Sequence, residues 1–399
     1  MFIFKYALLL TPVLATPRPF RNAKSAVYFL DNRSDGSSIV SIGVGQDGRL
    51  GGAIRTSTAG LGSSMVNGSG VPNAADSLGS QGSVVVSENV LFTVNAGSNT
   101  VVMFHIDPSD PTQLSIVGTP AASLGDFPIS VTYSKELRTV CVLNGGAQAG
   151  VACFHADPFH GLQPVGNLRP LGDALHETTP PSGPPGSASQ IRFNPDSSAL
   201  FVTTKGNAGS TPKQPGYILA WPVIGGRIQE TPVTTQVADL YMEFGFAFLS
   251  QSSIFVSDPS FGASVLTIDT DLRVTEKVHT TVAGQKAICW AEYDANLDSA
   301  YGNDAGQNLI YTFSAGSGAL TGSIPFTTNG TSSMAGAFDS TISGPYMYIL
   351  SGSPGLAVLD LAHGAQVQYL DLNRLGSRQG WMGMAHHDGG APPQWFNGQ

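Results

Sequence analysis

The sequence predicts an all-β protein folded as a seven-bladed β-propeller, with four antiparallel strands in each blade. Three observations lead to this prediction: a composition suited to short strands and tight turns, a strand pattern that recurs seven times, and a C-terminal segment that looks like the start of a blade with no blade after it. At 399 residues, the chain is long enough for two domains or for one large repetitive domain. The repeat favours the second arrangement.

The composition indicates many short buried strands. The chain contains 48 Gly and 26 Pro, with 41% hydrophobic and only 12% charged residues, and this balance suits strands joined by tight turns. The net charge is -9 with only 19 Lys plus Arg. Because so few cations cannot form a basic surface that neutralises phosphates, we expect neither nucleic acid nor an anionic membrane surface as a partner.

The repeat consists of an apolar strand, a short polar residue, a Gly/Asn/Ser-rich gap and a second apolar strand, and its clearest copy is LFTVNAGSNTVVMFHID from Leu91. The position of Phe92 in this copy recurs at Phe29, Cys141, Phe201, Phe255, Tyr301 and Tyr348. Three residues after these seven positions lie Asn32, Asn95, Asn144, Thr204, Asp258, Asp304 and Ser351. A short polar residue there predicts that each strand leaves the core and turns. Units with two apolar faces must stack and close into a ring, which is a propeller.

The two ends of the chain are expected to close the ring in one shared blade. The first copy of the repeat starts at Ala26 without a preceding strand, and Gly380 to His386 reads as a strand that could supply it. We therefore assign residues 26–390 to one propeller domain, 16–25 to an N-terminal lead-in and 391–399 to a C-terminal tail. The tail is polar, which argues against a lipid-anchor signal.

The N-terminus predicts secretion. Residues 1–15 place Lys5 before the apolar run 7–14 and end in a small residue, as signal peptides do. No later stretch approaches the roughly 20 consecutive apolar residues that span a bilayer. Acceptor triplets for N-glycosylation begin at Asn32, Asn67 and Asn329. We expect a secreted glycoprotein that is extracellular or associated with the cell wall.

The three cysteines are too few for a disulfide-built scaffold, so stability must come from the core. Cys141 and Cys153 flank a turn between two predicted strands and could form a disulfide across one hairpin, which would leave Cys289 alone. The alternative is that all three are buried thiols that act as small apolar residues.

The motifs favour no cofactor and no metal. Residues 43–48 match GxGxxG, but a β-like segment follows where a nucleotide site needs a helix, so we interpret the run as a hairpin turn. The chain has neither GxSxG nor GxxxxGK, which disfavours a standard serine hydrolase or a kinase. His386 and His387 are adjacent on a predicted strand, so they point to opposite faces and do not suit one metal ion.

Charged or polar residues near the ends of predicted inner strands are the candidates for a central site. We assign Glu243, Asp258 and Asp304 as acid or base candidates and Gln190, Lys205 and Lys286 as ligand-binding candidates. Burying charge near a channel is unfavourable unless a ligand or partner compensates. The alternative is that these residues form ion pairs between blades and caps of turns.

Four segments resemble a known group of proteins: CVLNGGAQAGVACF from Cys141, TTPPSGPPGSASQIRFNPDSSALFVTTKG from Thr178, VSDPSFGA from Val256 and GQKAICWAEY from Gly284. They resemble fungal secreted proteins related to 3-carboxymuconate cyclase, which belong with the lactonase-type seven-bladed propellers that include 6-phosphogluconolactonase. The resemblance covers essentially the whole mature chain. It implies a seven-bladed ring with a site at its centre.

The resemblance also implies site residues that this chain lacks. The wider family places a histidine at the start of the third blade, an Arg-His pair before the fourth-blade strand and a glutamate after it. In this chain the histidine position falls in 127–130 (FPIS), the Arg-His pair is replaced by Ser-Gln at 189–190, and the glutamate is replaced by Lys205. Because a cyclase needs a general acid and cations for its polyanionic substrate, the named activity does not transfer, whereas the fold does.

Two functions remain. The first is a central pocket for a small hydroxylated or carboxylated molecule, with lactone-forming or lactone-opening chemistry as the reaction suggested by the family. The second is a non-catalytic secreted or wall-associated glycoprotein that binds an extracellular glycan or matrix in adhesion or host contact. We expect a monomer in either case.

Overall fold

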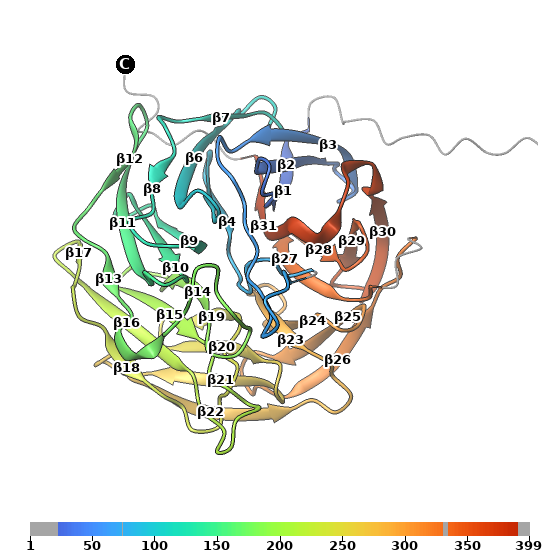
Figure 1. The fold of residues 1–399 in the computed structure, drawn as a ribbon. Helices are drawn as coiled ribbons and strands as arrows, with labels where there is room; N and C mark the ends of the chain where they lie inside the picture. Colours follow the sequence, from blue (N-terminus) through green and yellow to red (C-terminus); the bar gives the residue numbers. More distant parts are fainter. Residues whose placement is uncertain (1–22, 74, 330–333, 390–399) are drawn as a thin grey trace, which may run out of the picture.

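The computed structural model describes residues 23–73, 75–329 and 334–389. Seven antiparallel sheets stand around one axis as the blades of a ring, which confirms the predicted seven-bladed propeller (Figure 1). The described residues contain only three short 3-10 helices, Gly172–Ala174, Asn373–Leu375 and Arg378–Gly380. No helix in the described part of the chain has the length and apolarity that crossing a bilayer requires.

Each blade has four principal strands, which run in order from the inner strand outward. Blade 1 contains β31 (Trp381–His387), β1 (Ser25–Asp31), β2 (Ser38–Val44) and β3 (Leu50–Ser57). Blade 2 contains β4 (Val84–Ser87), β5 (Val90–Asn95), β6 (Thr100–Ile106) and β7 (Leu114–Ile116), and the short strand β8 (Ala121–Ala122) also pairs with β6. Blade 3 contains β9 (Pro128–Ser134), β10 (Thr139–Asn144), β11 (Gly150–Asp157) and β12 (Gly161–Pro164), with β13 (Arg169–Pro170) also on β11. Blade 4 contains β14 (Ala188–Phe193), β15 (Ala199–Thr204), β16 (Tyr217–Ile224) and β17 (Arg227–Ile228), with β18 (Val233–Thr235) also on β16.

The remaining three blades are regular. Blade 5 contains β19 (Phe246–Ser250), β20 (Ser253–Asp258), β21 (Gly262–Ile268) and β22 (Val274–Thr281). Blade 6 contains β23 (Ile288–Asp294), β24 (Ser299–Asp304), β25 (Leu309–Ser314) and β26 (Leu320–Pro325). Blade 7 contains β27 (Ala337–Ser343), β28 (Tyr346–Ser351), β29 (Gly355–Asp360) and β30 (Ala365–Asp371).

Strands from both ends of the chain close the ring, as the unpaired first repeat predicted. β31 pairs antiparallel with β1, in a register that places Ala26 opposite His387 and Asp31 opposite Trp381. Phe29 packs on Trp381 with 5.0 Å between ring centroids. The inner strand of blade 1 therefore comes from the C-terminal end of the described chain (Figure 1).

The repeat positions all fall on the second strand of a blade, and the short polar residues lie at or just after its end. All seven of these polar residues are buried. They tie the strand end to nearby linkers: the Asn144 amide donates to the Ser123 carbonyl at 3.0 Å, and the Asp304 carboxylate accepts from the Lys286 backbone N–H at 2.8 Å. Hydrogen bonds such as these explain why small polar side chains recur at the buried strand ends.

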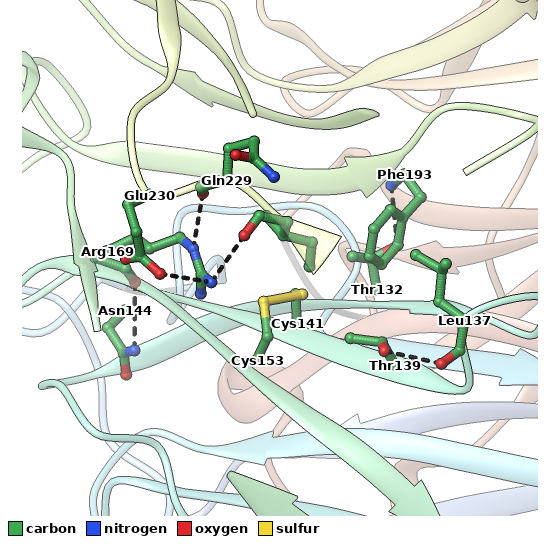
Figure 2. Close-up of a disulfide and its surroundings, with 12 residues drawn as sticks. Thr132, Leu137, Thr139, Cys141, Asn144, Cys153, Arg169, Phe193, Gln229 and Glu230 are labelled. Carbon is green, nitrogen blue, oxygen red and sulfur yellow. Dashed lines mark hydrogen bonds and ion pairs between the residues drawn. A yellow bond between two sulfur atoms is a disulfide. The ribbon is translucent and has the colours of Figure 1, made fainter. Parts of the chain in front are cut away.

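A disulfide crosses the hairpin of β10 and β11. Cys141 and Cys153 are directly opposed in the register, are buried, and are joined through their sulfurs (Figure 2). Cys289 is a free buried cysteine. Close by the disulfide, the Arg169 guanidinium donates to the carbonyls of Gln229 and Ile228 at 3.0 and 3.1 Å, which links blade 3 to blade 4 (Figure 2).

Some sequence-based assignments lie outside the described residues. These are the signal peptide (1–15), most of the lead-in (16–25) and the tail (391–399).

Among the three acceptor asparagines, Asn67 and Asn329 are exposed. Asn32 is buried and its amide nitrogen donates to the Ser63 carbonyl at 2.6 Å and to the Ser77 hydroxyl at 3.0 Å. A glycan on that nitrogen would have to break both contacts, so the fold disfavours glycosylation at Asn32.

Candidate functional site

A segment of the linker between blades 1 and 2 fills one end of the central channel. We call residues 75–83 the plug; the linker that contains it crosses the middle of the ring before β4 (Figure 1). The Ser80 hydroxyl donates to the Ile129 carbonyl at 2.9 Å, and the Ser130 hydroxyl donates to the Gln81 carbonyl at 2.6 Å. On the opposite side, the Trp290 indole donates to the Ser80 carbonyl at 3.2 Å. The plug is therefore bonded to blades 3 and 6 at once.

The plug occupies the places where the resemblance implies catalytic residues. Ser130 stands at the start of blade 3, the Ser189 carbonyl accepts from the Gln81 N–H at 3.3 Å, and Lys205 donates to the Gly79 carbonyl at 2.8 Å. All three positions thus form hydrogen bonds with the plug.

On the other side of the plug lies a cavity of about 550 Å³. The inner strands of blades 1, 2, 3, 4, 6 and 7 line it, and Gln81 and Gly82 of the plug form its floor. The lining includes the turns after inner strands, such as Lys135 and Glu136 after β9 and the segment 194–197 after β14. Because each second strand runs antiparallel to its inner strand, the buried polar strand ends lie at the opposite end of the channel.

Two carboxyl groups from neighbouring blades line this cavity: Glu292 on β23 and Asp339 on β27. Burial raises the pKa of Glu292 to about 7, against the opposing charges of Arg192 and His386. Burial also raises the pKa of Asp339 well above its ordinary value, and the nearby Glu292 adds to that shift. Both shifts disfavour the ionised form of the carboxyl, and the pKa of Glu292 falls within the physiological range.

The contacts of the two carboxyls leave room for a ligand. Asp339 Oδ1 accepts from the Ser340 N–H at 2.9 Å, and the Gly82 backbone N–H also acts on this carboxyl and opposes the rise of its pKa. Its buried Oδ2 has no hydrogen-bond partner of good geometry among the described residues. Glu292 Oε1 accepts from the Gln81 amide at 3.4 Å, a long contact. A buried polar atom without a partner is unfavourable unless a ligand or water satisfies it.

The cavity wall also contains Thr341 and His386, and His386 in turn contacts Asp388. Thr341 lies two residues after Asp339 on β27, so both side chains share the face toward the channel. The Thr341 hydroxyl lies 2.7 Å from His386 Nδ1 on β31, and His386 Nε2 lies 3.2 Å from Asp388 Oδ2. Asp388 also accepts from the Ser343 hydroxyl. His386 therefore contacts a hydroxyl through one ring nitrogen and a carboxylate through the other.

Of the six residues proposed from the sequence, only Gln190 lines this cavity. Its side-chain oxygen accepts from the Phe246 N–H at 2.7 Å, which links blade 4 to blade 5.

Lys205 is buried and its ammonium makes three hydrogen bonds, to the carbonyls of Gly79 and Ala188 and the hydroxyl of Ser187, at 2.8, 2.7 and 3.0 Å. Burial lowers the pKa of Lys205 to about 8, and Asp76 opposes the shift. Since an ammonium has three donors, Lys205 is saturated by the plug and blade 4. Its assignment as a ligand-binding residue stays a prediction.

The three acid candidates lie elsewhere. The Asp258 carboxylate is buried and accepts from the backbone N–H groups of Tyr241 and Met242 at 2.8 and 2.9 Å, so it caps a turn. Asp304 has the same role toward residues 286–287, where the Lys286 side chain itself is exposed. Glu243 is fully buried, and burial raises its pKa well above the ordinary value. The cavity lining contains none of these three carboxyl groups.

Sequence reasoning did not single out Glu292 and Asp339, which line the cavity, and it considered His386 only as a metal ligand. The sequence did contain a signal: each of the two acidic residues is a charged position in a mostly buried strand, and that strand directly precedes the strand with the repeat position. The two strands read ICWAEYD and AFDSTIS. No three His, Cys, Asp or Glu side chains in the described ranges gather closely enough to hold a metal ion.

Comparisons with known proteins identify the fold. No protein-family model matches the sequence, and no curated protein is significantly similar to it. Among solved structures, the periplasmic gluconolactonase of Pseudomonas aeruginosa superposes with a TM-score of 0.61 at 16% identity, over 87% of this chain and 95% of that one. A putative 6-phosphogluconolactonase from Bacteroides fragilis gives 0.60 at 12% identity, over 93% and 100% of the two chains. A functionally unknown protein from Desulfotomaculum acetoxidans gives 0.58 at 12% identity, over 92% and 99%. The chain therefore shares the propeller fold of lactonase-like proteins.

Proposed function

We propose that the chain is a hydrolase that opens a small, hydroxylated cyclic ester in the central cavity. The observation that carries this proposal is the pair Glu292 and Asp339, two carboxyls with raised pKa values that line one cavity. Pairs of carboxyls held in different protonation states provide a base and an acid at the same pH. A volume of about 550 Å³ suits a small-molecule site.

In this proposal, the ionised Glu292 is the general base. It takes a proton from a water molecule as the water oxygen attacks the ester carbonyl, and the charge that develops on the carbonyl oxygen is stabilised by the protonated Asp339 and by the Arg192 guanidinium. The ring C–O bond then breaks, and the alkoxide receives the proton that Glu292 took. The product is the open hydroxy acid.

Cavity chemistry favours an uncharged polyhydroxylated substrate. The lining includes the Gln190 amide nitrogen and the Thr132 hydroxyl, which can donate to substrate hydroxyl groups, whereas the Gln190 oxygen and the Asn194 side chain are bonded within the protein. The positive charges of Lys135 and Arg192 are balanced by Glu136 and Glu292 in the same cavity, so a polyanionic substrate has no excess of cations to bind. Sugar lactones without phosphate meet this description.

We also propose that the protein acts outside the cell. The signal-like residues 1–15 support this, and a disulfide between Cys141 and Cys153 persists in oxidising compartments. Exposed Asn67 and Asn329 are the acceptors for which we expect glycans. Digestion of secreted protein with an N-glycosidase, followed by peptide mapping of both sites, tests this part.

The catalytic proposal is tested with purified protein and a panel of aldonolactones, by following acid release at constant pH. Glu292→Gln and Asp339→Asn should each lower kcat/KM by about 10²- to 10⁴-fold. Matched controls are Glu230→Gln and Asp271→Asn, two exposed carboxylates outside the cavity. Saturable binding of a glycan or lactone without turnover would overturn the enzyme and support the non-catalytic alternative.

A further inference from the structure

We propose that Thr341, His386 and Asp388 form a nucleophile, base and carboxylate relay that cleaves open-chain esters through an acyl-Thr341 intermediate. This activity uses the cavity described above but goes beyond the proposed lactone hydrolysis, because it does not require Glu292 as base. It assigns a second reaction to the same channel.

The geometry of the relay fixes the role of each atom. Asp388 Oδ2 lies 3.2 Å from His386 Nε2, and the hydrogen bond with His386 is the largest contribution that lowers the pKa of Asp388 to about 2. In the relay, Nε2 donates its hydrogen to the Asp388 carboxylate, which leaves a lone pair at Nδ1. That lone pair faces the Thr341 hydroxyl at 2.7 Å. A hydroxyl bonded to a histidine that a third group orients is the arrangement of an activated nucleophile.

The supporting contacts hold the relay at the cavity wall. Ser343 donates its hydroxyl to Asp388 Oδ1, which leaves Oδ2 for the imidazole. The next residue, His387, points to the other face of β31, where its Nε2 contacts Asn89 Oδ1 at 2.7 Å. Only one of the two adjacent histidines therefore faces the channel. Thr341 and His386 both line the cavity, where the proposed ester would bind.

The chemical step balances without a further reagent. Thr341 Oγ1 forms a bond to the ester carbonyl carbon while its proton passes to His386 Nδ1, and Asp388 stabilises the resulting imidazolium. The bond from carbonyl carbon to leaving oxygen then breaks, and that oxygen takes the proton from Nδ1. Water next attacks acyl-Thr341 with His386 as base, which releases the acid and restores the threonine. Asp339 lines the same cavity, and we assign its protonated form as the donor to the carbonyl oxygen.

The test uses the full chain and p-nitrophenyl acetate. We expect a burst of p-nitrophenol at the start of the reaction, and peptide mapping of acid-quenched protein should place the acetyl group on Thr341. Thr132 lines the same cavity without a histidine partner and is the internal control for non-specific acylation. A wild-type protein without the burst, or with the acetyl group on another residue, overturns the relay.

Variants distinguish the relay from a merely structural contact. Thr341→Val keeps the size of the side chain and should abolish the burst, whereas Thr341→Ser should retain it. His386→Gln should slow acylation by about 10²- to 10⁴-fold. Acid release from the aldonolactone panel is measured in parallel on the same wild-type protein, so failure of the relay and failure of the proposed lactonase are separate outcomes. Acylation that persists in Thr341→Val overturns the proposal.

Discussion

The side-chain amide of Gln81 pairs with both backbone groups of Ala291, donating to its carbonyl at 2.8 Å and accepting from its N–H at 3.0 Å. This pair joins the plug, which precedes blade 2, to the inner strand of blade 6. The same amide reaches Glu292 Oε1, so the residue that closes the channel also touches a proposed catalytic group. The Gln81 side chain therefore contacts both the inner strand of blade 6 and the proposed catalytic residue Glu292.

Gln81→Ala should lower the free energy of unfolding by about 1 to 3 kcal/mol, because the backbone N–H and C=O of Ala291 lose their buried partner. Urea unfolding followed by tryptophan fluorescence measures the change. Gln251→Ala, which removes an exposed amide on blade 5, is the control and should change stability by less than about 0.5 kcal/mol. Equal effects of the two variants would show that the plug contact is not specially stabilising.

Lys205→Met should destabilise the protein by about 3 to 5 kcal/mol, because it leaves the Gly79 and Ala188 carbonyls without their donor and Asp76 without its nearest opposing charge. Thermal unfolding gives the loss, and titration with a lactone gives the affinity of the cavity. We expect a lower melting temperature with unchanged affinity. Reduced affinity at unchanged melting temperature would instead establish the ligand-binding role assigned to Lys205 from the sequence.

Glu292 makes stability depend on pH with a defined sign. Its folded-state pKa of about 7 exceeds the ordinary 4.5, so the folded state holds this proton more tightly than the unfolded state. The contribution is fully present below about pH 4.5 and is lost as pH rises toward 7. Glu292→Gln should therefore gain about 1 to 3 kcal/mol of stability over wild type at pH 8 and none at pH 4. Denaturant unfolding at the two pH values checks this, and an equal difference at both would contradict it.

Replacing both cysteines of the hairpin, Cys141→Ala with Cys153→Ala, should lower stability by about 2 to 4 kcal/mol. The disulfide closes a loop with a sequence separation of 12 in the core of blade 3, so its loss frees the unfolded chain. Non-reducing peptide mapping verifies the bridge beforehand. Cys289→Ala, which changes a free buried cysteine, is the control. Recovery of Cys141 and Cys153 as free thiols from secreted protein would contradict the bridge itself.

A chain that ends at Gln379 lacks β31 and should fail to accumulate as soluble folded protein. Without β31, the inner edge of β1 is unpaired and Phe29 loses its packing against Trp381. Size-exclusion chromatography and circular dichroism measure the outcome, with a chain that ends at Gly389 as the matched control. A Gln379-terminated protein with the melting temperature of the control would refute ring closure as a requirement for folding.

The sequence by itself determined the architecture because the signals that encode it are local. Phe92 and its counterparts mark the second strand of every blade, the polar residues after them mark where each strand ends, and the unpaired Ala26 strand indicates the closing partner near Trp381. Cys141 and Cys153 are close in sequence and flank one turn, so their pairing was also within reach of sequence reasoning.

Only the tertiary structure showed which side chains line the cavity that we propose as the site. Glu292, Asp339 and His386 come from three blades, and their proximity depends on how the inner strands stand around the channel and on which strand face turns inward. Strand-end charges such as Asp304 and Lys205 looked equally suited to a site, but Asp304 caps a turn and Lys205 holds the plug. The plug, a linker without a repeat pattern, fills one end of the channel through contacts to distant blades. Burial and these long-range hydrogen bonds, which no local pattern encodes, moved the candidate site to the other end.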